Sequence, residues 1–112
     1  MDLRQHLLRQ MAFSRGTFGP DARTAGVCDH IRKELDEVQQ SGGSPAEWVD
    51  VVILALDGLT RSMLYGADPA TQEWVAFRAC ELILEKQSHN EMRNWPDWRT
   101  APTDKAIEHV RS

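Results

Sequence analysis

The sequence has 112 residues, of which 41% are hydrophobic and 27% are charged, and its formal net charge is -4. A chain of this length and composition predicts one small soluble domain. The acidic balance argues against unaided binding to DNA or RNA, because no basic stripe offsets the charge of a phosphate backbone. An anionic partner is therefore expected to be small and to arrive with a metal ion.

The two cysteines and the N-terminal residues predict a cytoplasmic protein. Cys28 and Cys80 stand singly, without the C-x-x-C or histidine spacing of a zinc site, and are read as reduced thiols. Residues 1–10 are charged from the start and lack the apolar core of a signal peptide. No segment approaches membrane-spanning length, so no membrane partner is expected.

A first helix is predicted over about Leu3–Phe13. Its apolar residues recur at helical spacing: Leu7, Leu8 and Met11. The stretch Ser14–Pro20 then supplies two glycines and a proline beside Phe18, and predicts an ordered loop.

A second helix is predicted over about Ala22–Gln40. Its apolar stripe consists of Val27, Ile31, Leu35 and Val38. Glu34 falls inside this stripe, and Glu37 lies on its flank beside His30. A carboxylate on a buried face needs a partner, since charged side chains are almost never buried alone.

A third helix is predicted to begin at Ser44-Pro45 and to close near Gly66, because a capping serine and a proline favour a helix start. Its surface is apolar almost all round. The exceptions form one narrow polar stripe: Glu47, Asp50, Asp57 and Arg61. So short a chain has few helices with which to cover an apolar helix. The sequence therefore predicts a homo-oligomer, either a dimer or a tetramer.

Two acidic pairs are the most informative pattern in the chain. Glu34-x-x-Glu37 and Glu47-x-x-Asp50 each place two carboxylates on one helix face, and the short break over 41–44 makes the two helices antiparallel neighbours. Two charges about 4 Å apart repel by roughly 4 kcal/mol at an effective dielectric constant near 20. The cluster therefore predicts Mg²⁺ or Mn²⁺, which prefer oxygen ligands, with two or more ions per site.

Simpler explanations exist for part of this cluster. A capping box alone would account for Glu47, and a solvated helix face beside Lys33 would account for Glu37. Glu34 and Asp50 favour a functional role, because both stand where apolar residues are otherwise expected.

A fourth helix is predicted from Asp68-Pro69 to about Asn90. Lys86, Asn90 and Arg93 recur on one face of it and could face the acidic stripe, although cations are also ordinary near a helix C-terminus. Residues 95–98 are expected to break the helix, and Thr103–Val110 predicts a short terminal helix. No alternating pattern indicates a strand, so the predicted fold class is all-α.

Several strings resemble one family closely. They are Phe18-Gly19-Pro20, the segment 29–35 (DHIRKEL), the segment 47–58 (EWVDVVILALDG) and the pattern K-x-x-x-N-x-x-R-x-W-P over 86–96. They resemble the MazG-like, all-alpha nucleoside triphosphate pyrophosphohydrolases, and within them the mostly phage-borne dATP/dGTP pyrophosphohydrolases. The similarity covers nearly the whole chain, which implies a single domain over 1–112 that forms a compact helical bundle.

The resemblance also implies roles for individual residues. The metal ligands, which would also be the catalytic residues, are Glu34, Glu37, Glu47 and Asp50. The groups near the triphosphate are Lys86, Asn90 and Arg93. Asp57 is expected beside the metal ligands or as a further ligand, with Phe18 and Trp95 among the substrate contacts.

The activity implied is metal-dependent conversion of dGTP and dATP to monophosphates plus pyrophosphate. A context that the resemblance suggests is supply of dGMP for 2-aminoadenine (diaminopurine) phage DNA, in the host cytoplasm. Two alternatives remain open. One is a nucleotide-pool-cleaning pyrophosphohydrolase with another base preference, and the other is a non-catalytic helical oligomer that binds cations.

Overall fold

The computed structural model describes residues 1–63 and 68–111, and within these ranges it is all-α, as predicted. The described helices are α1 (Leu3–Phe18), α2 (Thr24–Gln40), α3 (Pro45–Met63), α4 (Pro69–Met92) and the short 3-10 helix η1 (Trp98–Thr100). The chain divides into two units, residues 1–80 and the residues from 81 onward, and α4 passes from one into the other. The predicted end of the third helix at Gly66 lies outside the described ranges.

Helix α1 begins with a capping box. The Asp2 carboxylate accepts a hydrogen bond from the Gln5 backbone N–H at 2.8 Å, and the Gln5 side chain accepts one from the Asp2 N–H at 2.9 Å. The helix ends at Gly19, whose φ of 87° suits glycine. Both ends of α1 are thus set by local chemistry.

The predicted loop over Ser14–Pro20 is wrong for its first five residues, which continue α1 to Phe18. The cause is tertiary. The Ser14 hydroxyl donates to Asp57 and the Ser14 carbonyl accepts from Arg61, so α3 holds the last turn of α1. These bonds outweigh the weak helix propensity of the glycine within that turn.

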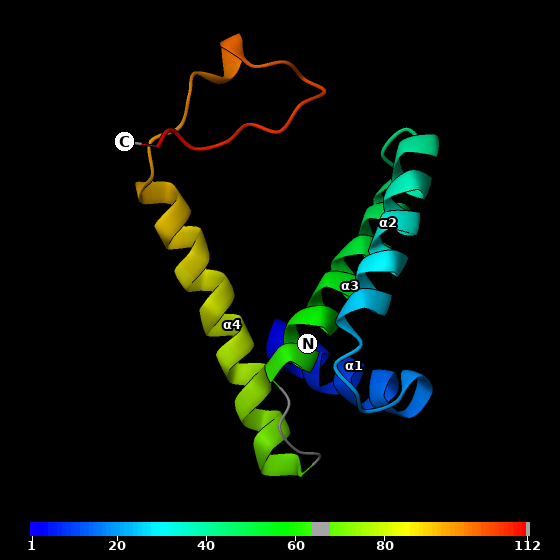
Figure 1. The fold of residues 1–112 in the computed structure, drawn as a ribbon. Helices are drawn as coiled ribbons and strands as arrows, with labels where there is room; N and C mark the ends of the chain where they lie inside the picture. The colour runs from blue at the N-terminus through cyan, green and yellow to red at the C-terminus, as the bar shows by residue number, and fades with distance from the viewer. Residues whose placement is uncertain (64–67, 112) are drawn as a thin grey trace. The chain divides into compact units, whose positions relative to one another are not determined.

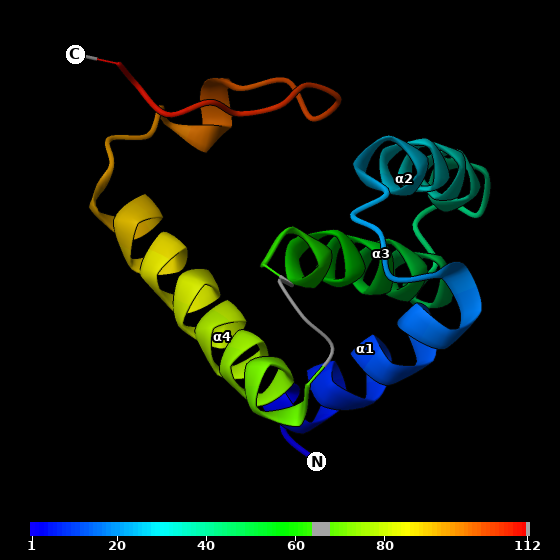
Figure 2. The same cartoon turned by 60° about the horizontal axis from the view of Figure 1, so that its bottom comes forward.

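Helices α2 and α3 form an antiparallel hairpin and lie side by side in both views (Figures 1 and 2). The link is tight because Gly42 and Gly43 adopt φ of 72° and 88°, which other residues rarely take. Helix α2 starts at Thr24, two residues later than predicted, because Arg23 has left-handed backbone angles. Helix α1 packs against α3 from another side (Figure 2).

The hydrophobic core of the first unit joins α1 to the beginning of α4. Its fully buried residues are Leu7, Met11, Val75, Ala76 and Ala79. Partly buried residues pack against it from three helices: Leu8 of α1, Leu56, Leu59 and Met63 of α3, and Cys80 of α4. Asp68 caps α4 as predicted, since its carboxylate accepts from the Thr71 backbone N–H at 3.0 Å.

One face of α3 is uncovered in the single chain. Trp48, Val49 and Val52 are 49%, 52% and 53% exposed. This exposure agrees with the expectation that so short a chain cannot cover the apolar surface of α3 by itself, and assembly into an oligomer stays a prediction. None of the described helices combines the length and the apolarity needed to cross a membrane.

The second unit contains the end of α4 and the residues that follow it. The Val110 N–H donates to the Asn94 carbonyl at 2.7 Å, so the chain returns toward the end of α4. The predicted terminal helix over Thr103–Val110 is wrong: these residues form turns and irregular backbone. Ile107 and Val110 remain 43% and 52% exposed, so this segment lacks the apolar packing that a short helix requires.

Candidate metal centre

Three of the four predicted carboxylates converge across the α2–α3 hairpin. Glu34, Glu37 and Glu47 each offer an oxygen, and these oxygens lie within 4.8 Å of one another. The spacing of three residues puts the first two on one face of α2, and the tight turn brings the first turn of α3 beside them. We call Glu34, Glu37 and Glu47 the acidic cluster.

The acidic cluster is partly buried and incompletely hydrogen-bonded. The Glu34 side chain is only 16% exposed, whereas the neighbouring Leu35 is 40% exposed, so α2 turns a carboxylate inward. The Oε2 atoms of Glu34 and Glu47 are buried without a hydrogen-bond partner. A buried carboxylate oxygen left unpaired is costly, and a divalent cation would satisfy both atoms. The donor set therefore fits a hard cation such as Mg²⁺ or Mn²⁺.

The electrostatics of the cluster agree with this fit. Burial raises the pKa of Glu34, and the hydrogen bond and negative charge of Glu37 and the charge of Asp50 add to that increase, while His30 opposes it. Burial likewise raises the pKa of Glu47, again with contributions from Glu37 and Asp50. The carboxylates disfavour one another's ionised forms, which a bound cation would reverse.

One sequence expectation about this region needs correction. Asp50 is exposed, not buried, and stands outside the set of three converging oxygens, although its charge reaches Glu34 and Glu47. His30, on the same helix, places its Nε2 atom 3.4 Å from Glu34 Oε1.

The capping-box explanation for Glu47 is not supported. The backbone N–H of Ser44, which a capping box would use, instead donates to the Ser41 hydroxyl at 3.1 Å. The Glu47 carboxylate interacts with Glu37. Glu47 thus belongs to the cluster by its contacts as well as by its spacing.

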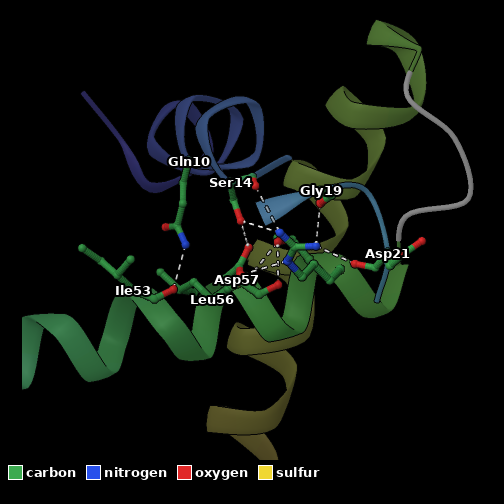
Figure 3. Close-up of polar contacts among 9 residues, drawn as sticks. Gln10, Ser14, Gly19, Asp21, Ile53, Leu56 and Asp57 are labelled. Carbon is green, nitrogen blue, oxygen red and sulfur yellow. Dashed lines mark hydrogen bonds and ion pairs between the residues drawn. The ribbon is translucent and has the colours of Figure 1, made fainter. Parts of the chain in front are cut away.

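Asp57 lies farther along α3 in a different environment. Its Oδ1 accepts from the Ser14 hydroxyl at 2.6 Å, and its Oδ2 accepts from Arg61 Nε at 2.9 Å (Figure 3). Arg61 also donates to the backbone carbonyls of Ser14, Gly19 and Asp21. We call Ser14, Asp57 and Arg61 the buried polar network.

The sequence indicates only part of this network. The spacing of four residues between Asp57 and Arg61 is an ion-pair signal on a helix. The sequence does not indicate a role for Ser14, because no local pattern predicts that the end of α1 lies against α3. Asp57 therefore holds the fold together, which adds a structural role to the one expected beside the metal ligands.

A cavity of about 90 Å³ is lined by residues of α1, α2 and α3 and by Arg23, which precedes α2. Phe18, Arg23, His30 and Asp57 line it, together with Gly26, Val27 and Leu54. His30 links the two features, because it lines the cavity and also contacts Glu34. Phe18, expected to contact substrate, is thus placed on the wall of this cavity.

The remaining predicted residues belong to the second unit. Lys86 is exposed on α4, and Arg93 Nη1 donates to Asn90 Oδ1 at 3.3 Å. Trp95 donates from Nε1 to the Asn90 carbonyl at 2.7 Å, and its ring packs edge-on against His109. A cavity of about 350 Å³ beside them is lined by Arg93, His109 and Arg111, among others.

Comparison with known proteins identifies one family. A family model described as dATP/dGTP pyrophosphohydrolase matches residues 7–112. No curated protein and no solved structure matches the chain. The matched range contains the acidic cluster, the buried polar network and both cavities, and it confirms the resemblance drawn from the sequence strings.

Proposed function

The chain belongs to the dATP/dGTP pyrophosphohydrolase family, and we propose that it hydrolyses dGTP and dATP to the monophosphate and pyrophosphate with Mg²⁺ or Mn²⁺. The observation that carries this proposal is the pair of buried carboxylate oxygens without a partner, on Glu34 and Glu47. These oxygens favour a site that is completed by a ligand. A polyphosphate accompanied by divalent cations is such a ligand.

The residues proposed to hold the cations are Glu34, Glu37, Glu47 and Asp50. When bound, a divalent cation lowers the pKa of the attacking water and neutralises charge on the phosphate oxygens. Glu34 or Glu37 is proposed to accept the proton released from that water. Asp50, which is exposed, is proposed as the outermost of these ligands.

Lys86, Asn90 and Arg93 are proposed to contact the triphosphate. An arginine fork suits two phosphate oxygens and a lysine supplies a point charge. The hydrogen bond between Arg93 and Asn90 supports their action as a pair. Trp95, which donates to the Asn90 carbonyl, would fix the end of α4 that presents them and is proposed as a further substrate contact.

We further propose that the chain works as a homo-oligomer, a dimer or a tetramer. The uncovered apolar face of α3, with Trp48, Val49 and Val52, supports this assembly. Light scattering at micromolar concentration tests it directly. A monomer would contradict the proposal, and dissociation by Val52→Asp but not by the exposed control Gln39→Asp would support it.

Supply of dGMP for 2-aminoadenine DNA remains the proposed biological context. The competing pool-cleaning function would use the same acidic cluster with another base, and a cation-binding protein would use it without turnover. One assay separates the three. Purified protein is incubated with Mg²⁺ or Mn²⁺ and each of the common nucleoside triphosphates, and the nucleotide and inorganic products are quantified.

We expect equal amounts of dGMP and pyrophosphate from dGTP. In water enriched in ¹⁸O, attack at the α-phosphorus places the label in dGMP and not in pyrophosphate. Orthophosphate as the first product would contradict the proposal. Faster turnover of a pyrimidine or damaged nucleotide would favour pool cleaning, and cation binding without turnover would favour the non-catalytic alternative.

A further inference from the structure

Arg23 has an unusual backbone conformation. Its φ is 53°, and among the described residues it is the one non-glycine residue with positive φ. A non-glycine residue in this region costs free energy and persists only where the surrounding structure enforces it. Such residues are found most often at active sites and ligand-binding sites, so the conformation of Arg23 suggests a functional role.

The buried polar network enforces the conformation. Arg61 is buried, with only 5% of the residue exposed. Its guanidinium donates to the carbonyls of Gly19 and Asp21 (Figure 3). These two carbonyls belong to the loop between α1 and α2. Asp57 accepts from Arg61 Nε and so fixes the guanidinium in turn. The loop that ends in Arg23 is therefore fastened to α3.

The Arg23 side chain lines the cavity that His30, a neighbour of Glu34, also lines. A Cβ atom added to Gly26 would lie 3.0 Å from Arg23 Nη2, so the glycine leaves room for the guanidinium. The Arg23 Cζ atom lies 5.9 Å from the centre of the Phe18 ring. Arg23, Gly26 and Phe18 all line the cavity.

The size of the cavity limits what it can hold. At about 90 Å³ it is far smaller than the roughly 300 Å³ or more of a site for a whole ligand. It can take part of one flat ring, with the sugar and phosphates outside. Its wall combines the aromatic Phe18 with the apolar Val27 and Leu54, which suits the face of such a ring.

The polar groups on the wall match one purine better than the other. Guanine offers two acceptors, O6 and N7, to the donors of an arginine, whereas adenine places the N6 donor where O6 would be. A carboxylate has about four lone-pair sites, and Ser14 and Arg61 use two of those on Asp57. The remaining sites can accept from the guanine N2 amino group, which adenine lacks.

We infer that this cavity is a base-reading subsite in which Arg23, positioned by the buried polar network, selects guanine over adenine. The inference rests on the proposed function and names the substrate that the site prefers. Arg23 is then a specificity-determining residue, and Arg61 is a positioning residue that acts through the loop.

The test measures binding of dGMP and dAMP by calorimetry in the presence of Mg²⁺, because binding of the monophosphates does not depend on hydrolysis. The variants are Arg23→Met and Gly26→Ala, whose added methyl group displaces the guanidinium. Arg32→Met, which removes an exposed arginine of α2, is the matched control. Circular dichroism verifies that each variant is folded.

We expect the wild type to bind dGMP about tenfold or more tightly than dAMP, because one bidentate base contact gives discrimination of that size. Arg23→Met should lose most of this preference for dGMP. Gly26→Ala should lose part of the preference, and Arg32→Met none. Equal binding of the two purines by the wild type, an unchanged ratio in Arg23→Met, or no binding of either monophosphate at millimolar concentration overturns the inference.

The same experiment distinguishes this inference from the proposed function. A protein that prefers dGMP but hydrolyses no triphosphate would contradict the function and leave the base subsite standing. For an active enzyme, the ratio of kcat/KM for dGTP to that for dATP should fall in Arg23→Met, and also in Arg61→Lys, with kcat for dGTP changing less than KM. A change in kcat alone would contradict positioning by Arg61.

Discussion

Helix α3 contributes to two groups of polar side chains with opposite electrostatic character, one partly buried and one buried. Near its start, Glu47 meets Glu34 and Glu37, so like charges converge and two oxygens have no partner. Farther along, Asp57 meets Arg61 and the Ser14 hydroxyl, so opposite charges converge and both Asp57 oxygens are bonded. In the second group each carboxylate oxygen has a hydrogen-bond partner within the chain, whereas in the first, two buried oxygens have none among the described residues.

The two groups differ in whether their buried polar atoms have hydrogen-bond partners within the protein. Burial of charge is costly in both places, but the buried polar network recovers the cost through complementary charge and several hydrogen bonds. In the acidic cluster no group among the described residues fully offsets the cost of burying the charges. The pKa values of Glu34 and Glu47 are raised for this reason.

The largest effect on stability is expected from breaking the buried polar network. Arg61→Met leaves Asp57 buried without its cation, which costs about 3–5 kcal/mol of the free energy of unfolding. A loss of this size is a large fraction of the total stability of a small domain. Urea denaturation followed by circular dichroism measures it, with Arg32→Met as the control.

A double variant sharpens this prediction. Asp57→Leu combined with Arg61→Met removes both buried charges, and replacement of a buried ion pair by apolar groups is often neutral for stability. We expect it to recover most of the stability lost in Arg61→Met. A double variant as unstable as Arg61→Met would show that the hydrogen bonds to the loop carbonyls, and not the unpaired charge, dominate.

Neutralising the acidic cluster should instead destroy activity and spare the fold. Glu34→Gln or Glu47→Gln should lower turnover of dGTP by on the order of 10² to 10³, the effect of removing one preorganised electrostatic group. The matched control is Asp36→Asn, an exposed acid of α2 outside the cluster. Near-normal Mg²⁺-dependent turnover in both glutamine variants would contradict the assignment.

Added metal should stabilise the protein through the acidic cluster alone. Mn²⁺ at a hundred times its Kd should add roughly 2.7 kcal/mol to the free energy of unfolding, by mass action on the folded state. Thermal denaturation with and without a chelator measures the gain. Glu34→Gln should lose most of it while Asp36→Asn keeps it, and an equal gain in both variants would place the metal elsewhere.

The smallest effect is a dependence of stability on pH in metal-free buffer. Because the native pKa values of Glu34 and Glu47 are raised, the folded state binds protons more tightly than the unfolded state. Stability should therefore fall as pH rises from about 4.3, the ordinary glutamate pKa, through the raised native values.

The same experiment in variants identifies the source of this dependence. Glu34→Gln should flatten the decline, and saturating Mn²⁺ should remove it, because the cation favours the ionised carboxylates. Stability that instead rises across this window in the wild type, with the same slope in Glu34→Gln, would count against repulsion within the acidic cluster.

Local rules in the sequence were sufficient for much of this protein. The E-x-x-E and E-x-x-D spacings placed carboxylates on single helix faces, and the glycine-containing break made α2 and α3 neighbours, so the convergence of Glu34, Glu37 and Glu47 followed. The start of α4 after Asp68 was equally predictable, because a cap acts over three residues. The family resemblance came from strings that lie mostly on these same helices.

Contacts between distant residues decided the rest. Ser14 was predicted to lie in a loop but is helical, because residues 43 and 47 positions away bind it. Thr103–Val110 has a helical pattern, yet without an apolar surface to cover it forms turns and irregular backbone. Arg61, from another helix, donates to the carbonyls of Gly19 and Asp21 in the loop that leads to Arg23. Helix type and spacing are short-range properties that sequence encodes directly, whereas partners for buried polar groups and strained backbone arise only when separate helices meet.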